Sequence, residues 1–573
     1  MIARLHADAR AIPILLALVG VCGIVASSNA TFVQAATYAG IYAIAAIGLS
    51  LLLGSVNQIS LGQAAFFGIG AYAVAYLTTS ANWSYWPALV VGVVLAAFFG
   101  VVIGFIALRF HGHYLAMATL AFNLICVGIF HQWKLIGGAV GINNIPFAQL
   151  GPIRIAGTPA FWFAWIAAAI VALLSLRLLR GRMGYAFEAI RNDELAAEVT
   201  GVPTRRCKIV AFTYAGALAG LSGAMYVAVI GLMAPDIPGV GLTVDLLLMV
   251  VLGGMGSVSG AIIGACFIGF LSITGHSFDN WREVAYGVVV IAVVVAAPGG
   301  LFGLIRGRAR TRATDGAPAP RIESAMAPLV LHSNELPLVV SGVTKRFGGL
   351  IAVDAVSFAL EYGTLTSLIG PNGAGKTTLF NAMSGIGRVN SGTIRIAGTS
   401  VTGWAPHRIA RLGVGRTFQN ARLFDEMTVL ENVVASVLAL TRVNERAAND
   451  RARETLARLG LEHLSTTYAM HLPFGERRRV ELARAIAADP WLLLVDEPAA
   501  GLNARERTTL QQDLLAIRGR GVTILLIEHD MKLVMSISDR VMVLQFGKMI
   551  ADGTAGAIRN DPLVAAAYLG IAS

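Results

Sequence analysis

Gly370-Pro371-Asn372-Gly373-Ala374-Gly375-Lys376-Thr377-Thr378 is the stretch that decides the fold of the second half of this chain. It follows the apolar run Leu365–Ile369, which predicts a buried strand, and it opens a predicted helix. In such a P-loop, glycines let backbone N–H groups close around phosphates at a helix N-terminus. Lys376 would reach the β- and γ-phosphate oxygens, and the hydroxyl of Thr377 would bind Mg²⁺. The stretch therefore predicts an α/β domain that binds ATP with Mg²⁺.

Two acidic residues end another apolar run. The run 492–495 predicts a buried strand, and Asp496 and Glu497 follow it directly. We expect Asp496 to hold Mg²⁺ and Glu497 to act on the attacking water. Glu497 would be either a general base or a group that only orients the water, and the sequence favours neither. Because positioning and electrostatics do most of the work in phosphoryl transfer, the pair predicts hydrolysis of ATP.

The first half of the chain has a different composition. Of all 573 residues, 56% are hydrophobic and only 13% are charged, which is too little polar surface for a soluble protein of this length. Apolar runs dominate up to about residue 304, and from residue 334 onward the charge density is that of a soluble domain. The sequence predicts a transmembrane domain over 1–304, a flexible cytoplasmic linker over 305–336 and the ATPase domain over 337–573.

Several apolar stretches are candidates for membrane spans, since a spanning helix needs ~20 apolar residues. They are 11–28, 32–54, 59–79, 86–108, 114–132, 160–179, 208–232, 242–275 and 284–304. With the N-terminus inside, an even number of crossings is needed to leave the ATPase domain in the cytoplasm. Gly253–Ser257 can divide 242–275 into two short passes, which gives ten spans; alternatively, these glycines only allow close helix packing. We predict a polytopic α-helical membrane domain with eight to ten spans.

The net charge of +11 is explained by topology rather than by binding to nucleic acid. Basic residues cluster in the short loop 177–208 and in 306–312, as the positive-inside rule predicts for cytoplasmic segments. The first thirty residues also have the pattern of a signal peptide. We favour an uncleaved first helix, because more spans follow it.

The loop 181–208 contains an amphipathic segment, 185–199, which predicts one short helix. Such a helix would lie on the membrane surface or dock into a groove of a cytoplasmic partner, and the ATPase downstream favours docking.

Ionisable or amide side chains within the spans are few. They are Asn57, Gln58, Gln63, Asn123 and Asp245. Each is costly in lipid, and we expect hydrogen bonds between helices from them rather than contacts with a substrate.

The order of motifs in the second half resembles an ABC-transporter ATPase. After the P-loop come Gly415–Gln419, then Leu472–Glu476, then the two acids, then His529. The resemblance implies that Gln419 is the Q-loop glutamine, which senses the γ-phosphate and the permease and also serves as a Mg²⁺ ligand with Thr377 and Asp496. His529 would be the switch histidine that contacts the γ-phosphate.

The same resemblance assigns three further elements. It makes Ala500–Asn503 the D-loop and Phe347 the aromatic residue that stacks on adenine. The signature motif would consist of Leu472, Pro473, Phe474, Gly475 and Glu476.

The signature motif departs from the usual pattern at two positions. Pro473 stands where a serine hydroxyl normally binds the γ-phosphate held by the opposite ATPase, and proline has neither hydroxyl nor backbone N–H. Glu476 replaces the usual glutamine. Gly475 and the N-terminus of a helix predicted over 477–485 would remain as anion donors. We expect an asymmetric dimer in which the site built on Lys376 is complete if the signature motif of the partner is intact, while the opposite site is weaker.

The whole chain, apart from the linker, resembles the high-affinity branched-chain amino-acid uptake system. The membrane half is similar to its second permease subunit in Ser60–Tyr72, Ala189–Glu198 and Leu252–Ser257. The soluble half is similar to its first ATPase, with Gly415–Asn420 and an end at Asp561–Gly570.

This resemblance implies an importer in the bacterial inner membrane. The partners would be a second permease, a second ATPase, a periplasmic substrate-binding protein and membrane lipid, with no nucleic acid. Relatives of this system take up urea, amides or aromatic acids, so these cargoes stay open beside branched-chain amino acids. An exporter and an ATP-gated protein without transport are the rival functions, and the short basic loops and the permease resemblance argue against them.

Overall fold

The computed structural model describes residues 2–25, 29–110, 112–274, 284, 287, 288, 291, 292, 295–297, 299–306 and 335–569. The chain forms two compact units, described separately here. The first comprises Met1–Arg191 and Arg205–Arg310, and the second comprises Asn192–Thr204 and Thr311–Ser573. Most of the predicted linker 305–336, and much of the predicted span 284–304, lie outside the described residues.

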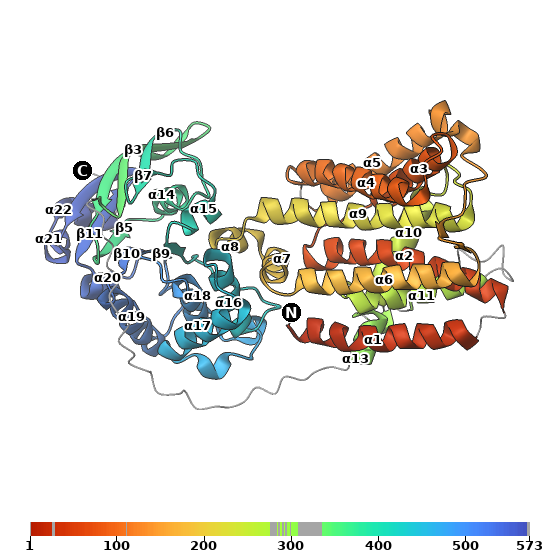
Figure 1. Cartoon of the computed structure of the whole chain (residues 1–573). Helices are drawn as coiled ribbons and strands as arrows, with labels where there is room; N and C mark the ends of the chain where they lie inside the picture. Colours follow the sequence, from red (N-terminus) through yellow and green to blue (C-terminus); the bar gives the residue numbers. More distant parts are fainter. Residues whose placement is uncertain are drawn as a thin grey trace. The chain divides into compact units, whose positions relative to one another are not determined.

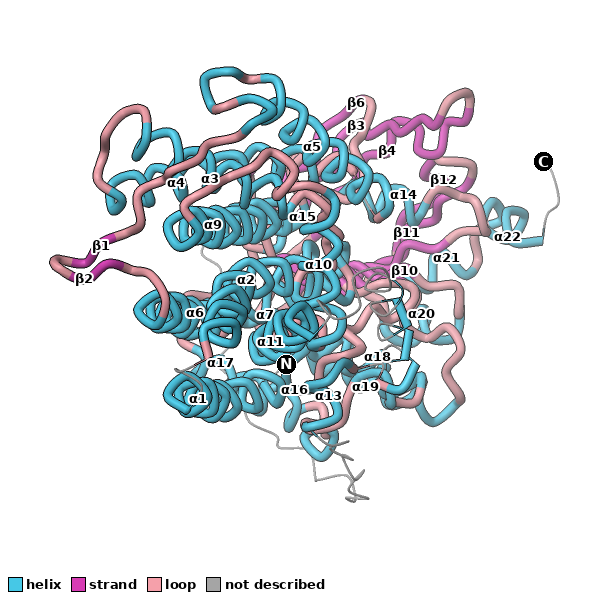
Figure 2. Tube along the Cα trace, turned by 90° about the vertical axis from the view of Figure 1, so that its right-hand side faces the viewer, coloured by secondary structure: helices cyan, strands magenta, loops and turns pink. Residues whose placement is uncertain are grey.

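The first unit is built from helices that run side by side (Figures 1 and 2). Their bounds are α1 Ile2–Val25, α2 Ala30–Ser55, α3 Gln63–Thr79, α4 Tyr85–Ala107, α5 His113–Gln132, α6 Thr158–Leu179, α7 Arg182–Asn192, α9 Thr204–Ile230, α10 Val240–Gly253, α11 Val258–Thr274 and α13 Gly300–Arg306. Among the described residues, α2, α4, α5, α6 and α9 are long and apolar enough to cross a membrane, and 10–21, α10 and 258–271 are shorter apolar helices. Two short 3-10 turns (Lys134–Ile136, Gly138–Val140) and a pair of two-residue strands (β1 Gln149–Leu150, β2 Ile153–Arg154) join α5 to α6.

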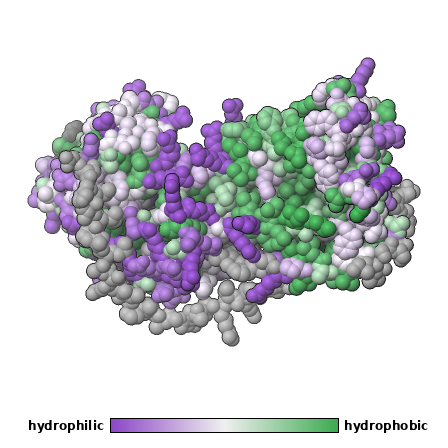
Figure 3. Space-filling model, viewed as in Figure 1, coloured by the Kyte–Doolittle hydropathy of each residue, from purple (hydrophilic) through white to green (hydrophobic). Residues whose placement is uncertain are grey.

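The outer surface of this unit is apolar, which fits a lipid environment. On α4, Val94 and Phe98 are 61% and 58% exposed, and Leu173 on α6 is 59% exposed. Hydrophobic surface covers much of the face of these helices shown in Figure 3. Exposed side chains of this kind would destabilise a protein in water, whereas lipid tails accommodate them.

Small residues bring the helices of this unit close together. A Cβ at Gly70 would lie 2.2 Å from the carbonyl oxygen of Gly220 on α9, and one at Gly264 would lie 1.8 Å from that of Met249. Without a hydrophobic force between helices in lipid, close backbone contact supplies much of the packing energy.

The predicted break at Gly253–Ser257 is confirmed, since α10 ends at Gly253 and α11 begins at Val258. Gly254 has φ +119°, a backbone conformation that suits glycine. Gly253 also packs closely, because a Cβ there would lie 1.9 Å from the Gly260 carbonyl oxygen. The helix break and the close packing, which were alternatives for the sequence, occur together.

The expected start of the span 59–79 was wrong, because α3 begins at Gln63. The residues directly before it are not helical, and one of them bonds to another helix: the backbone N–H of Leu61 donates to Thr119 Oγ1 on α5 at 2.9 Å. Gln63 Nε2 donates to the Ala215 carbonyl at 2.9 Å, and Asn123 Nδ2 donates to Thr243 Oγ1 at 3.3 Å. These two amides form the hydrogen bonds between helices that we expected.

The single helix predicted over 185–199 was wrong. The structure has α7, which ends at Asn192, and a separate helix α8 (Glu194–Val199) in the second unit. Asp193 lies between them with φ −155° and ψ 107°, and its side chain accepts from the Ala196 N–H as the N-cap of α8. An aspartate that can cap the following turn favours a new helix start over continuation, and a hydrophobic periodicity does not reveal this.

The second unit contains two sheets. One has six strands in the order β12-β11-β5-β10-β9-β8, with β12 antiparallel to β11 and the other pairs parallel. The other is antiparallel, in the order β4-β3-β6-β7. The strands are β3 Leu338–Phe347, β4 Leu350–Leu360, β5 Leu365–Ile369, β6 Ser391–Ile396, β7 Thr399–Ser400, β8 Val414–Arg416, β9 Leu492–Asp496, β10 Thr523–Ile527, β11 Arg540–Gln545 and β12 Lys548–Gly553.

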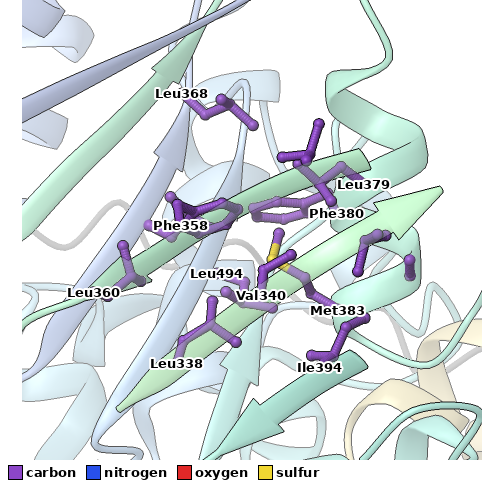
Figure 4. Packing of buried hydrophobic residues seen from close by; sticks show 14 of the residues in the cluster. Leu338, Val340, Phe358, Leu360, Leu368, Leu379, Phe380, Met383, Ile394 and Leu494 are labelled. Atoms are coloured by element: carbon purple, nitrogen blue, oxygen red, sulfur yellow. The ribbon is translucent and has the colours of Figure 1, made fainter. Parts of the chain in front are cut away.

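Helices surround these sheets (Figure 1). They are α14 Lys376–Met383, α15 Pro406–Ala410, α16 Val429–Leu440, α17 Glu445–Arg458, α18 Phe474–Ile486, α19 Ala504–Gly519, α20 Met531–Ile537, α21 Ala555–Arg559 and α22 Pro562–Leu569, with 3-10 turns at Glu462–Leu464 and Ala469–His471. A core that includes Phe358, Phe380 and Leu494 joins the antiparallel sheet, α14 and the parallel sheet (Figure 4). This core fixes the P-loop helix against the strands that carry the acidic residues.

Candidate ATPase site

The P-loop lies between β5 and α14, as predicted. Strand β5 ends at Ile369 and α14 begins at Lys376. Gly375 has φ +99°, and a Cβ there would lie 2.1 Å from the Ala352 carbonyl oxygen, so glycine is required for this approach of the loop to β4. The N-terminus of α14 therefore presents backbone N–H groups that a phosphate can accept.

Lys376 is buried at the root of this loop. Its Nζ donates to the carbonyl oxygens of Gly370 at 2.7 Å and Pro371 at 3.0 Å. Burial lowers the pKa of Lys376, and the carboxylates of Glu497 and Asp496 act in the opposite direction. The ammonium is thus placed in a low-dielectric site where it interacts strongly with negative charge.

Asp496 ends β9 and is 2% exposed. Burial raises its pKa to about 6, with Arg416 opposing that rise and Glu497 adding to it. Its Oδ1 is buried and has no hydrogen-bond partner among the described residues. A buried carboxylate oxygen without a donor is costly unless a cation binds it, so Asp496 fits a Mg²⁺ ligand. With the predicted ligands Thr377 and Gln419, it would hold an ion that neutralises charge on the transferred phosphoryl group.

Glu497, Gln419 and His529 come together from three segments far apart in the sequence. Gln419 Nε2 donates to Glu497 Oε2 at 2.9 Å, and His529 Nδ1 lies 3.7 Å from the same oxygen. Glu497 has φ +42°, an uncommon backbone conformation for a residue other than glycine. Strain of this kind persists where the surroundings hold a functional group in place. The three predicted catalytic residues therefore form one cluster.

Glu528 is a member of this site that the sequence did not indicate. It is completely buried, and its Oε1 accepts from the Ala499 N–H at 2.8 Å. Its Oε2 accepts from the N–H groups of His529 at 2.9 Å and Asp530 at 3.2 Å. A carboxylate directly after the predicted strand 522–527 was the only available signal. It ties the backbone beside His529 to the segment before the D-loop.

Arg416 is a second residue of the site to which the sequence analysis gave no role; it named only the motif Gly415–Gln419 that contains it. Its guanidinium donates to Asn381 Oδ1 at 2.7 Å and to Ser384 Oγ, and lies 4.0 Å from Asp496 Oδ2. Burial lowers its pKa to about 10, so the group stays charged near neutral pH. It anchors the end of β8 to α14 next to Asp496.

The signature motif forms the N-terminus of α18. The helix predicted over 477–485 starts earlier than expected, at Phe474, with Pro473 as N-cap and no side-chain cap. Proline is tolerated there because that position needs no helical N–H bond, and the Pro473 carbonyl accepts from Arg477 at 3.0 Å. A Cβ at Gly475 would lie 2.2 Å from Glu506 Oε1, so this glycine allows α18 to approach α19.

The remaining predicted residues lie at the edges of the unit. Asn503 of the D-loop is the N-cap of α19 and forms a capping box with Glu506. Phe474 lies against Gly501, where a Cβ would be 3.0 Å from its ring. Phe347 ends β3 and is 56% exposed. Lys345 Nζ lies 4.8 Å from the centroid of its ring.

Comparisons with known proteins agree with this geometry. Residues 31–297 match the permease component of the branched-chain amino acid transport system. Residues 353–500 match the ABC transporter family, and 548–572 match the branched-chain amino acid ATP-binding cassette transporter family.

Two relatives are each covered almost completely by the second half of the chain. The high-affinity branched-chain amino acid transport ATP-binding protein BraF of Pseudomonas aeruginosa is 45% identical over 248 residues, which is 41% of this chain and 97% of that protein. LivG of Escherichia coli K12, with the same description, is 46% identical over the same shares. The chain belongs to the branched-chain amino acid ABC transporter family.

This family member joins a permease and an ATP-binding cassette in one polypeptide. A solved nucleotide-free cassette from an ABC transporter is 29% identical, with a TM-score of 0.38 over 41% of this chain and 98% of that one. The second half is an ABC transporter ATPase domain, and the cluster of Gln419, Glu497 and His529 lies within it.

Proposed function

We propose that this chain is one half of an ATP-driven importer of branched-chain amino acids in the bacterial inner membrane. Residues 1–304 would be the permease domain, 305–336 the linker and 337–573 the cassette. The observation that carries the proposal is the fusion of a branched-chain amino acid permease to a cassette of the same system in one chain. The other permease, the other ATPase and the periplasmic binding protein would complete the assembly.

In the cassette we propose that ATP binds with its phosphates on residues 370–378 and its adenine on Phe347. Lys376 would hold the β- and γ-phosphates, and Thr377, Asp496 and Gln419 would hold Mg²⁺. Glu497 would act on the attacking water, with His529 near the γ-phosphate. The distances support this assignment, because Gln419 and His529 both lie close to the same carboxylate oxygen of Glu497.

The contacts of α8 support a role in coupling. Within the second unit, Asp193 Oδ2 accepts from Arg422 at 2.8 Å, and Asn192 Oδ1 accepts from the Glu426 N–H at 2.8 Å. Arg422 lies three residues after Gln419 in the same loop. The segment 192–204 is therefore attached beside the residue that would sense the γ-phosphate.

The opposite end of this segment has its own contacts. Glu198 lies 3.6 Å from His407 on α15. A Cβ at Gly201 would lie 2.3 Å from Leu440 on α16, so glycine lets the chain pass close to that helix. Because α8 is held at both ends, movement of the cassette on ATP binding would pass to the permease through it. The permease would then turn outward, and hydrolysis with phosphate release would reset it.

The test is reconstitution of the full chain with its partner subunits in proteoliposomes. ATPase stimulation by the binding protein and solute uptake would be measured with leucine, urea and benzoate in turn. We expect stimulation and uptake with leucine. Stimulation by urea or benzoate alone would assign the chain to the related cargoes, and stimulation by none of them would overturn the importer.

A further inference from the structure

The loop of residues 418–422, which carries Gln419, is called the Q-loop here. Side chains of α18 form hydrogen bonds to its backbone. Arg478 on α18 donates from one guanidinium nitrogen to the Phe418 carbonyl at 2.8 Å and from the other to the Gln419 carbonyl. Glu481, one turn further on, accepts from the Arg422 N–H at 3.1 Å and also bonds to the backbone of Phe418. The two side chains hold the carbonyls and the N–H groups on either side of Gln419.

Arg478 and Glu481, together called the clamp here, are buried and ionisable side chains. Arg478 is 4% and Glu481 is 1% exposed, and Arg484 lies 3.7 Å from Glu481 on the same helix. Burial raises the pKa of Glu481 to about 7, opposed by Arg484 and by the backbone donors of the Q-loop. Charge-assisted hydrogen bonds in a low-dielectric site are stronger than neutral ones. Among the described residues, neither side chain hydrogen-bonds to the P-loop. Arg478 also interacts electrostatically with Asp496 and Glu497.

The clamp joins two parts of the machinery that belong to different ATP molecules. Gln419 reaches Glu497 of its own site at 2.9 Å. The N-terminus of α18, one turn before Arg478, is the motif Leu472–Glu476, which on the proposed function meets the ATP held by the opposite cassette. A helix of 13 residues is about 20 Å long and moves as a rigid element, so its displacement is transmitted to the Q-loop.

We propose that Arg478 and Glu481 are positioning residues that make Gln419 of one ATP site follow the signature helix engaged by the other ATP. The inference rests on the proposed roles of Gln419 and of the signature motif. It adds a route of communication between the two sites that does not pass through the permease. Pro473 would weaken binding of the motif to the opposite ATP because it lacks a hydroxyl, whereas Arg478 and Glu481 make their hydrogen bonds to the Q-loop.

The chain offers a matched control for Arg478. Its neighbour Arg479 is also an arginine of α18 with an ion pair, to Asp513 Oδ2 at 2.9 Å, and it donates to the Leu459 carbonyl. Arg479 bonds away from the Q-loop. Each variant removes one charged side chain of α18 and its hydrogen bonds to a backbone carbonyl, and only R478M removes bonds to the Q-loop, so a difference between R478M and R479M reports the clamp.

The experiment measures kcat, KM for ATP and the Hill coefficient of ATP hydrolysis for the full chain assembled with its partners. We expect R478M to lower kcat ~10- to 100-fold, as displacement of a positioned group does, with KM for ATP within about twofold and a Hill coefficient reduced toward one. R479M is expected to match the wild type. An equal loss in R479M, or no loss in R478M, overturns the proposal.

A double-mutant cycle with Gln419 separates positioning from mere support of the fold. If Arg478 acts through Gln419, R478M lowers kcat no further in a Q419A background. A full additional loss in that background shows that Arg478 acts elsewhere and sinks the inference. If Q419A alone leaves kcat unchanged, the proposed role of Gln419 is what fails, and this result differs from every other outcome.

Glu481 supplies an independent variant, because R478M alone tests only half of the clamp. E481Q keeps an oxygen that accepts from the Arg422 N–H, whereas E481M removes it and keeps the length of the side chain. We expect E481Q to retain most of the wild-type kcat and E481M to lose as much as R478M. Equal kcat values for E481Q and E481M contradict the clamp.

Discussion

The ATP site around Lys376 and the signature end of α18 belong to the same cassette, yet they are built in opposite ways. In the ATP site, charged groups converge: Lys376, Asp496 and Glu497 act on one another electrostatically, and Gln419 and His529 reach Glu497. The signature end has no side-chain cap, and Pro473 and Phe474 occupy its first positions. This difference is the basis for expecting that ATP hydrolysis is concentrated in the site that this chain builds around Lys376. What it lends to a partner is mainly backbone and shape.

The strongest test of this comparison is the variant Glu497→Gln. We expect kcat for ATP hydrolysis by the assembled transporter to fall at least ~100-fold, because general-base assistance and water positioning are lost from the complete site. The control is Glu454→Gln on α17, an exposed carboxylate that pairs with Arg458 on the same helix, which should leave kcat unchanged. If activity survives Glu497→Gln and disappears with the equivalent change in the partner, the asymmetry runs the other way.

The second test uses the proton at Asp496. Its pKa is raised to about 6, so the carboxylate is mostly protonated at pH 5 and mostly ionised at pH 7. A proton competes with Mg²⁺ for the same oxygens, and we expect the Mg²⁺ concentration for half-maximal ATPase activity to rise about tenfold from pH 7 to pH 5. Binding of ATP without Mg²⁺, measured at both pH values, corrects for protonation of the nucleotide. An unchanged Mg²⁺ requirement would remove Asp496 from the ligand set.

The third test concerns the segment 192–204, which contacts the cassette at Arg422 and Glu426. Asp193→Arg replaces the ion pair with Arg422 by a like-charge contact, and the pair is partly exposed, so we expect leucine uptake per ATP to fall about fivefold. Adding Arg422→Asp to Asp193→Arg should restore part of the leucine uptake per ATP. Asp552→Arg, which breaks the ion pair with Arg540 at comparable exposure, is the control. The effect should shrink at high salt, and a loss that salt does not alter would point to distorted packing.

The smallest expected effect comes from Pro473→Ser. A serine restores a hydroxyl for the opposite γ-phosphate and a side-chain cap for α18, and we expect a rise in kcat of about twofold with a modest gain in stability. Pro473→Ala removes the ring without adding a hydroxyl and should leave kcat as it is. Equal kcat values for the two variants would mean that the signature end is limited by something other than the missing hydroxyl.

Several features of this chain follow from short-range rules and could be predicted. The P-loop lies between a buried strand and a helix because its glycines and Lys376 meet a local backbone requirement, and β5 has the bounds predicted for it. The break at Gly253–Ser257 was predicted because glycine has a distinct backbone freedom. The two acids at the end of β9 were predicted from a run of apolar residues that ends in charge.

Other features depend on partners far away in the chain. The residues at the start of α3 bond to Thr119 and Ala215. Asp193, which separates α7 from α8 as a local N-cap, also pairs with the distant Arg422. Periodicity within one segment carries no information about these. Periodicity does not indicate the role of Glu528 either, because this carboxylate accepts from the N–H of Ala499, 29 residues earlier.

The sequence by itself therefore determined that this chain has a membrane half and an ATPase half, and it predicted which residues carry the chemistry. Local backbone rules and the cost of polar groups in lipid are enough for that. Only the tertiary structure decided that Gln419 and His529 share the Glu497 carboxylate, and that Arg478 and Glu481 hold the Q-loop. The reason is physical: burial and long-range hydrogen bonds set the charge and the position of a side chain, and both arise only when distant segments pack together.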